Sequence, residues 1–98
     1  MRFELSDNLL TLFFEGELNS YNADVMEKEV DEVLSSSKFQ TLNLDFAKLH
    51  YISSAGLRVL LSAQKIMNNQ GSMVVKNVSE EVNEIFEVTG FADILTIE

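Results

Sequence analysis

The 98-residue sequence contains no cysteine, no proline and no tryptophan, and it has a single histidine. Without cysteine there can be no disulfide, thiolate metal site or cysteine nucleophile. Without proline, no part of the chain has the composition of a proline-rich linker or tail. One histidine among scattered carboxylates gives no metal-ligand spacing, so we predict no metal site. The apolar runs are all too short to span a bilayer.

Basic residues are also few: 7 Lys and Arg face 16 Asp and Glu, for a formal net charge of −9. Such a chain repels phosphate backbones and anionic membrane surfaces, so we predict no binding to nucleic acid and no direct membrane insertion. The charge serves either solubility alone or complementarity to a basic protein surface. The first residues lack the apolar core of a secretory signal, and we therefore expect a cytoplasmic protein.

The spacing of apolar residues predicts one α/β domain over residues 1–98. Residues 3–5 and 9–14 predict a hairpin around Asp7-Asn8, and Gly16 is expected to end its second strand. Further strands are expected at residues 42–46, 73–75 and 94–97, with residues 47–52 as a loop. Helices are expected after Asn19-Ser20 as far as Ser35-Ser36-Ser37, over residues 54–68, and from the cap Ser79 to Gly90.

This order is β-β-α-β-α-β-α-β. Repeated strand-helix-strand units favour parallel pairs with right-handed crossovers, and the hairpin adds an antiparallel pair. We expect a small mixed β-sheet of about five strands with helices packed on it.

The segment over residues 44–65, LDFAKLHYISSAGLRVLLSAQK, is the most informative part of the chain. It places Ser53 and Ser54 at a helix N-terminus, where free N–H groups and the positive dipole end favour an anion such as a phosphate on serine. Ala55 and Gly56 are small, so another protein's active site can approach. Serine is also a preferred N-cap, and three interpretations stay open: a cap alone, a phosphorylated serine, or Ser53 as cap beside an exposed Ser54.

The run Tyr51-Ile52-Ser53-Ser54-Ala55-Gly56-Leu57-Arg58-Val59-Leu60-Leu61 resembles the signature of STAS domains, in particular of anti-sigma factor antagonists. Further similar segments, in the same order, are Gly16-Glu17-Leu18-Asn19, Leu44-Asp45 and Glu87-Val88-Thr89-Gly90-Phe91. The resemblance implies a STAS-like, non-enzymatic domain that binds an anti-sigma factor, itself an ATP-dependent serine kinase, and so frees a sigma factor for transcription. Phosphorylation would release the domain, and a serine phosphatase would reset it. The ATP belongs to the partner, and no cofactor is expected in this chain.

The same resemblance implies which residues act. Ser54 corresponds to the phosphorylated serine, with Ser53 as the second candidate, and the implied partner-binding residues are Asn19, Ser53, Ser54, Gly56, Leu57 and Arg58. Two positions that are commonly acidic in the family are Ser53 and Asn19 in this chain. If Ser54 were not phosphorylated, the domain would bind its partner constitutively.

Other functions compete with this one. His50 and Asp45 near the serines suggest a hydrolase, but no Gly-x-Ser-x-Gly elbow is present. A non-phosphorylated adaptor subunit of a lipid-transport or stress-sensing complex would keep the fold and change the partner. The apolar arc of residues 57–67 is either packed in the core or partly a partner surface near Arg58 and Ser62.

Overall fold

The computed structural model describes residues 2–36 and 39–98, so Ser37, expected at the end of the first helix, lies outside the described residues. Its elements are β1 (Arg2–Ser6), β2 (Leu9–Leu18), α1 (Ala23–Ser36), β3 (Thr41–Ile52), α2 (Ser54–Asn68), β4 (Ser72–Lys76), α3 (Glu80–Thr89) and the 3-10 helix η1 (Phe91–Asp93).

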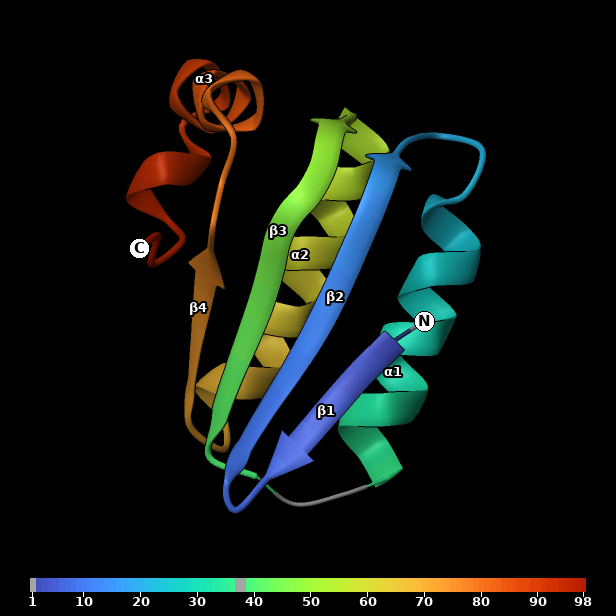
Figure 1. Cartoon of the computed structure of the whole chain (residues 1–98), viewed down its shortest axis with the longest axis vertical. Helices are drawn as coiled ribbons and strands as arrows, with labels where there is room; N and C mark the ends of the chain where they lie inside the picture. The colour runs from blue at the N-terminus through green and yellow to red at the C-terminus, as the bar shows by residue number, and fades with distance from the viewer. Residues whose placement is uncertain (1, 37–38) are drawn as a thin grey trace.

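The four strands form one sheet in the order β1-β2-β3-β4. Strand β1 is antiparallel to β2, whereas β2, β3 and β4 run parallel. Helices α1 and α2 lie together behind the sheet in Figure 1, and α3 lies above the end of β4, near the upper end of β3. The predicted mixed α/β fold with an N-terminal hairpin is confirmed.

The hairpin turn is made by a residue type suited to it. Asp7 has a φ of 54°, in the left-handed region that Asp and Asn tolerate better than most residues. The backbone carbonyl of Asn8 then accepts hydrogen bonds from Gln40 N at 2.9 Å and Thr41 N at 3.0 Å. The hairpin is thereby tied to the start of β3, which lies next to β2 in the sheet.

The prediction of a loop over residues 47–52 is wrong, because β3 continues through them to Ile52. In this half of the strand the buried residues are Phe46, Leu49 and Ile52, a spacing of three that does not fit strand alternation. The register explains it: Asp45 pairs with Phe13, but Lys48 pairs with Glu15, so β3 holds an extra residue there, and a second irregularity follows near Tyr51. Each such bulge reverses the facing of the residues beyond it and brings every third side chain inward.

Strand β2 is also longer than predicted. Gly16 does not end it, and the strand runs on to the buried Leu18. Gly16 has a φ of 73° and lies beside the second register irregularity between β2 and β3. Glycine adopts this backbone conformation without steric cost, so the residue expected to break the strand lets it bend instead.

The predicted strand at residues 94–97 is wrong as well, and over the described residues the sheet has four strands rather than about five. After Gly90 the chain forms η1, in which Phe91 O accepts from Ile94 N at 3.0 Å and from Leu95 N at 2.9 Å. Leu95 is buried, and only the single bridge between Val75 and Ile97 joins this segment to β4. These local bonds hold the chain in a turn where sequence alternation favoured a strand.

One hydrophobic core joins the helices to the sheet. The ring of Phe46 on β3 lies edge to face with the ring of Phe14, at a centroid distance of 5.2 Å. Its centroid is 6.3 Å from that of Phe86 on α3. Both predicted ends of α3 are confirmed: Ser79 Oγ accepts from Val82 N at 3.2 Å, and Gly90 is left-handed with a φ of 82°. Phe46 therefore fixes α3 against the sheet.

We predict that Phe46→Ala lowers the free energy of unfolding by about 3–5 kcal/mol, because it removes a fully buried ring and leaves a cavity. Phe3→Ala is the matched control, since Phe3 is 49% exposed at the edge strand. Urea unfolding monitored by circular dichroism measures both. Equal losses for the two variants would contradict the central place given to Phe46.

Candidate functional site

The predicted site lies where β2 and β3 end. Because these strands are parallel, their carboxyl ends meet at one edge of the sheet, and the chain leaves them for α1 and α2 (Figure 1). Leu18 and Ile52 form the last register pair, and Ser53 N then donates to Leu18 O at 2.9 Å. The start of α2 is thus fixed directly beside the segment that follows β2.

Ser53 is the N-cap of α2. Its backbone is extended, and its Oγ accepts from Gly56 N at 3.2 Å. Its carbonyl oxygen accepts from Leu57 N at 2.9 Å. The side chain is half-buried, so this hydroxyl serves the helix.

Ser54 is the first residue of α2 and is exposed. Within residues 2–36 and 39–98 its hydroxyl makes no hydrogen bond to another residue. The N–H groups of Ser54 and Ala55 belong to the first helical turn, which has no intrahelical acceptors, and they favour a negative charge at this position. Of the three interpretations that the sequence left open, the geometry matches the third: Ser53 caps, and Ser54 is free.

Gly56 lets α2 approach the sheet. A Cβ on this residue would lie 2.7 Å from Leu18 O and 2.8 Å from Ile52 Cγ1, closer than atoms of this kind can pack. Gly56 and Leu57 are both buried. Of the six predicted partner-binding residues, the structure exposes Ser54 and Arg58 and half-exposes Asn19 and Ser53, whereas Gly56 and Leu57 shape the site from beneath.

Asn19 begins the turn before α1. Its Oδ1 accepts from Tyr21 N at 3.0 Å and Asn22 N at 3.2 Å, and Asn22 Oδ1 accepts in return from Asn19 N at 2.8 Å. This reciprocal pair is a capping box made of two asparagines three residues apart. The sequence prediction found Asn19 and missed Asn22, although the Asn-x-x-Asn spacing was the available signal.

The other chemistry considered for this region finds no support in the geometry. Asp45 Oδ1 accepts from the backbone N of Ala47 at 2.9 Å, and among the described residues exposed His50 makes no hydrogen bond to Ser53 or Ser54. The apolar arc of α2 faces the core, with Leu57, Leu60 and Met67 all buried. Over the described ranges no three side chains are grouped as metal ligands, and no helix is long and apolar enough to cross a membrane.

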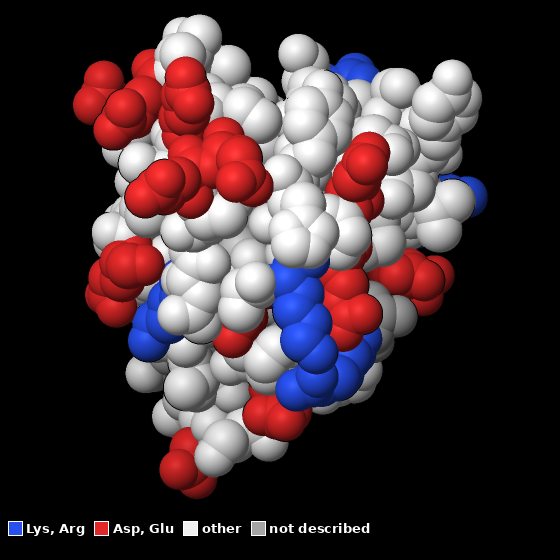
Figure 2. Space-filling view, turned by 45° about the horizontal axis from the view of Figure 1, so that its top comes forward, with Lys and Arg blue, Asp and Glu red and all other residues white. Residues whose placement is uncertain are grey.

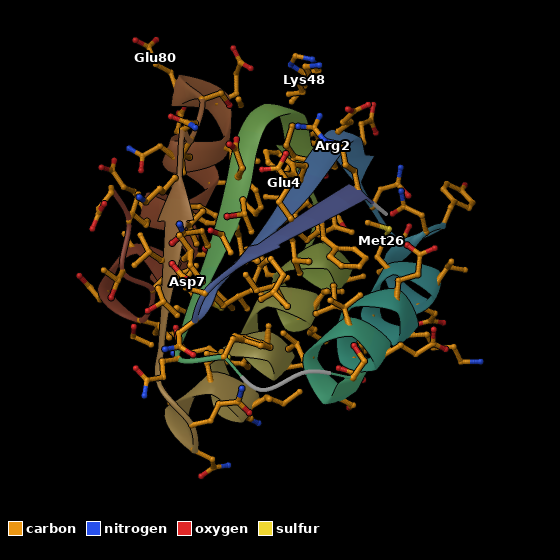
Figure 3. The ribbon with its side chains drawn as sticks, turned by 60° about the horizontal axis from the view of Figure 1, so that its bottom comes forward. Arg2, Glu4, Asp7, Met26, Lys48 and Glu80 are labelled. Carbon is orange, nitrogen blue, oxygen red and sulfur yellow. The ribbon has the colours of Figure 1, made fainter. Side chains whose placement is uncertain are left out.

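A hollow of about 210 Å³ lies over β1, β2 and β3, and both Arg2 and Lys48 line it (Figure 3). Its other lining residues are Phe13, Phe14, Glu15, Asp45 and Ala47. The two cations are matched by two carboxylates, so the hollow has no preference for an anion. Figure 2 shows a central stripe of basic side chains with acidic side chains next to it, smaller basic patches near the edges, and more acidic than basic side chains on this face.

Comparison with known proteins gives a consistent family. The STAS domain family matches residues 1–98. The chain is 37% identical to BtrV of Bordetella bronchiseptica, assigned as an anti-sigma factor antagonist, over 93% of this chain and 78% of that protein. It is 31% identical to the anti-sigma-B factor antagonist of Listeria monocytogenes, over 91% of this chain and 78% of the relative.

Among solved structures, the phosphorylated form of the Bacillus cell fate determinant SpoIIAA superposes with a TM-score of 0.73. The match covers 99% of this chain and 89% of that one at 15% sequence identity, which establishes likeness of fold.

The two serines should respond differently to the same substitution. We predict that Ser53→Ala lowers the free energy of unfolding by about 0.5–2 kcal/mol, since it removes the N-cap. Ser54→Ala should change it by less than about 0.5 kcal/mol, because the exposed hydroxyl contacts nothing that the fold needs. Chemical denaturation of both variants tests this, and a larger loss for Ser54→Ala would exchange the roles assigned here.

Gly56→Ala should destabilise the domain although alanine is the better helix former. Alanine would gain about 1 kcal/mol of helix propensity, but its Cβ collides with the backbone oxygen of Leu18. We expect a net loss of about 1–3 kcal/mol, seen as a lower urea midpoint than that of Ser54→Ala. An unchanged or higher midpoint would show that α2 can move away from β2 freely.

Proposed function

The chain belongs to the STAS domain family, and from this premise we propose that it is an anti-sigma factor antagonist released from its partner by phosphorylation of Ser54. The resemblance seen in the sequence is confirmed by the family match over residues 1–98. In this proposal the partner is an anti-sigma factor that is also an ATP-dependent serine kinase. Binding frees a sigma factor, and a phosphatase returns the domain to its binding form.

The observation that carries the proposal is the division between the adjacent serines. Ser53 supplies the cap of α2, and Ser54 stands exposed at the first helical position, where a kinase can reach its hydroxyl. A phosphate there would face the N-terminus of α2 and gain about 0.3–1 kcal/mol from the helix dipole. The modified domain would therefore keep its fold.

Release follows from charge. A phosphoserine adds about −1.5 to −2 charges at pH 7. Burying that group unpaired against a protein surface costs several kcal/mol, and each 1.4 kcal/mol is about a tenfold loss of affinity. Weaker binding by orders of magnitude thus needs no large change of shape.

Acidic residues are common in the family at the positions of Ser53 and Asn19. Both residues can still accept backbone hydrogen bonds at these positions, as an acidic side chain could. Each uses a side-chain oxygen to accept backbone N–H groups at a helix start, as a carboxylate would. What they lack is negative charge beside Ser54. A phosphate on Ser54 would accordingly meet less repulsion within this domain, so the loss of the two acids supports phosphorylation of Ser54.

A pull-down from native-host lysate tests the proposal, with wild type and Ser54→Asp as parallel baits. We expect wild type to recover an ATP-binding, kinase-like protein identified by mass spectrometry, and Ser54→Asp to recover at least about tenfold less, because the carboxylate brings charge into the contact. Ser72→Asp is the matched control, since Ser72 is exposed at the opposite end of the parallel strands.

Equal recovery of the partner by wild type and Ser54→Asp would leave a binding domain whose Ser54 is no switch. Recovery of membrane-transport subunits by both baits would replace the proposal with the adaptor function.

A further inference from the structure

The most exposed large hydrophobic side chain in the described part of the protein is Tyr21, at 95%. It lies between β2 and α1, two residues after Asn19, whose carbonyl accepts from Ala23 N at 2.9 Å. Val25 on the first turn of α1 is 59% exposed, and Tyr51 near the end of β3 is 44% exposed. Three apolar side chains are thus uncovered at the end of the molecule that carries Ser54.

The backbone beneath Tyr21 is held firmly. Tyr21 N donates to Asn19 Oδ1 at 3.0 Å, and Asn22 Nδ2 donates to Glu17 O at 2.8 Å. Both asparagines also cap each other's backbone. The ring is therefore presented on a fixed turn and packs against almost nothing in its own chain. Binding of a partner would cost little conformational entropy in this backbone.

The backbone segments that carry the exposed rings begin next to the serine site. Glu17 is the register partner of Tyr51, and the next residue, Leu18, accepts the hydrogen bond from Ser53 N. The turn of Tyr21 begins one residue later. The segments that carry Tyr21, Tyr51 and Ser54 therefore leave the sheet at the same edge.

The charges around Tyr21 define its complement. Residues 17–32 contain six Asp and Glu and one basic residue, Lys28. Glu17 and Asp24 are both exposed. A partner surface that fits this segment has an apolar pocket bordered by basic side chains.

We propose that Tyr21 is the aromatic anchor of this docking surface and that it enters an apolar pocket with a basic rim on the kinase partner, with Val25 and Tyr51 beside it. The inference rests on the proposed function and adds the residue on which recognition depends. A tyrosine suits this role, because it buries a large area while fixing only two side-chain torsions.

The test measures how fast Ser54 is phosphorylated in native-host lysate supplied with ATP, by quantitative mass spectrometry at a low concentration of the domain. Tyr21→Ala should slow the initial rate at least about tenfold, within the range of an interface hot spot. Tyr21→Phe should retain most of the rate, because the ring supplies the contact area. Val88→Ala is the control, since Val88 is 81% exposed on α3, and it should match wild type.

Folding is checked separately. The turn uses the backbone N–H of Tyr21 and not its ring, so Tyr21→Ala should unfold at the wild-type urea midpoint. Asp24→Lys should also slow phosphorylation, because it places a cation against the basic rim.

If Tyr21→Ala is phosphorylated at the wild-type rate, the anchor is overturned while the proposed function stands. If wild type itself gains no phosphate on Ser54, the proposed function fails and the anchor fails with it. A slow Tyr21→Ala that is also unfolded would overturn the anchor as well, since the ring would then serve the fold.

Discussion

The end of the domain that carries Ser54 depends on one close contact, between the first turn of α2 and the last residues of β2. With no side chain on Gly56, the helix start can lie against the Leu18 carbonyl, and Ser53 N completes the contact by donating to the same oxygen. This contact sets the height of α2 relative to the strand ends. Ser54 and Arg58 are exposed because Gly56 and Leu57 are driven inward.

How much could be predicted depended on whether the deciding interactions were local. The bounds of α2, Ser54 to Asn68, followed from an N-cap serine, helical spacing and a turn cluster, all of which act within a few residues. The second half of β3 was missed because bulges against β2 place Leu49 and Ile52 inward, and the register of a neighbouring strand cannot be found in local alternation. Residues 94–97 alternate like a strand, yet the hydrogen bonds to Phe91 O hold their start in a turn.

In the site, too, local sequence predicted some features and the rest depended on contacts in three dimensions. Sequence pattern and resemblance pointed to Ser53, Ser54 and Asn19, but serine at a helix start is equally a cap or a modification site, and only the hydrogen bond from Gly56 N assigns the two serines. Tyr21 gave no signal. An aromatic residue next to a helix start is as easily buried as exposed, and which of these occurs is decided by what packs over it in three dimensions.

In the proposed function, the separation of the cap on Ser53 from the acceptor Ser54 would let the domain be phosphorylated and released without refolding. Were one hydroxyl to do both, the phosphate would be attached to the very oxygen that accepts from Gly56 N, and its own oxygens would have to take over the cap beside the close contact of Gly56 with Leu18. With the cap on Ser53, the phosphate adds charge at an exposed position whose free N–H groups favour it. The turn of Tyr21, held by its own asparagine pair, is equally untouched. Phosphorylation of Ser54, as proposed, would then change the surface charge alone, and the same surface could bind the partner again once the phosphate was removed.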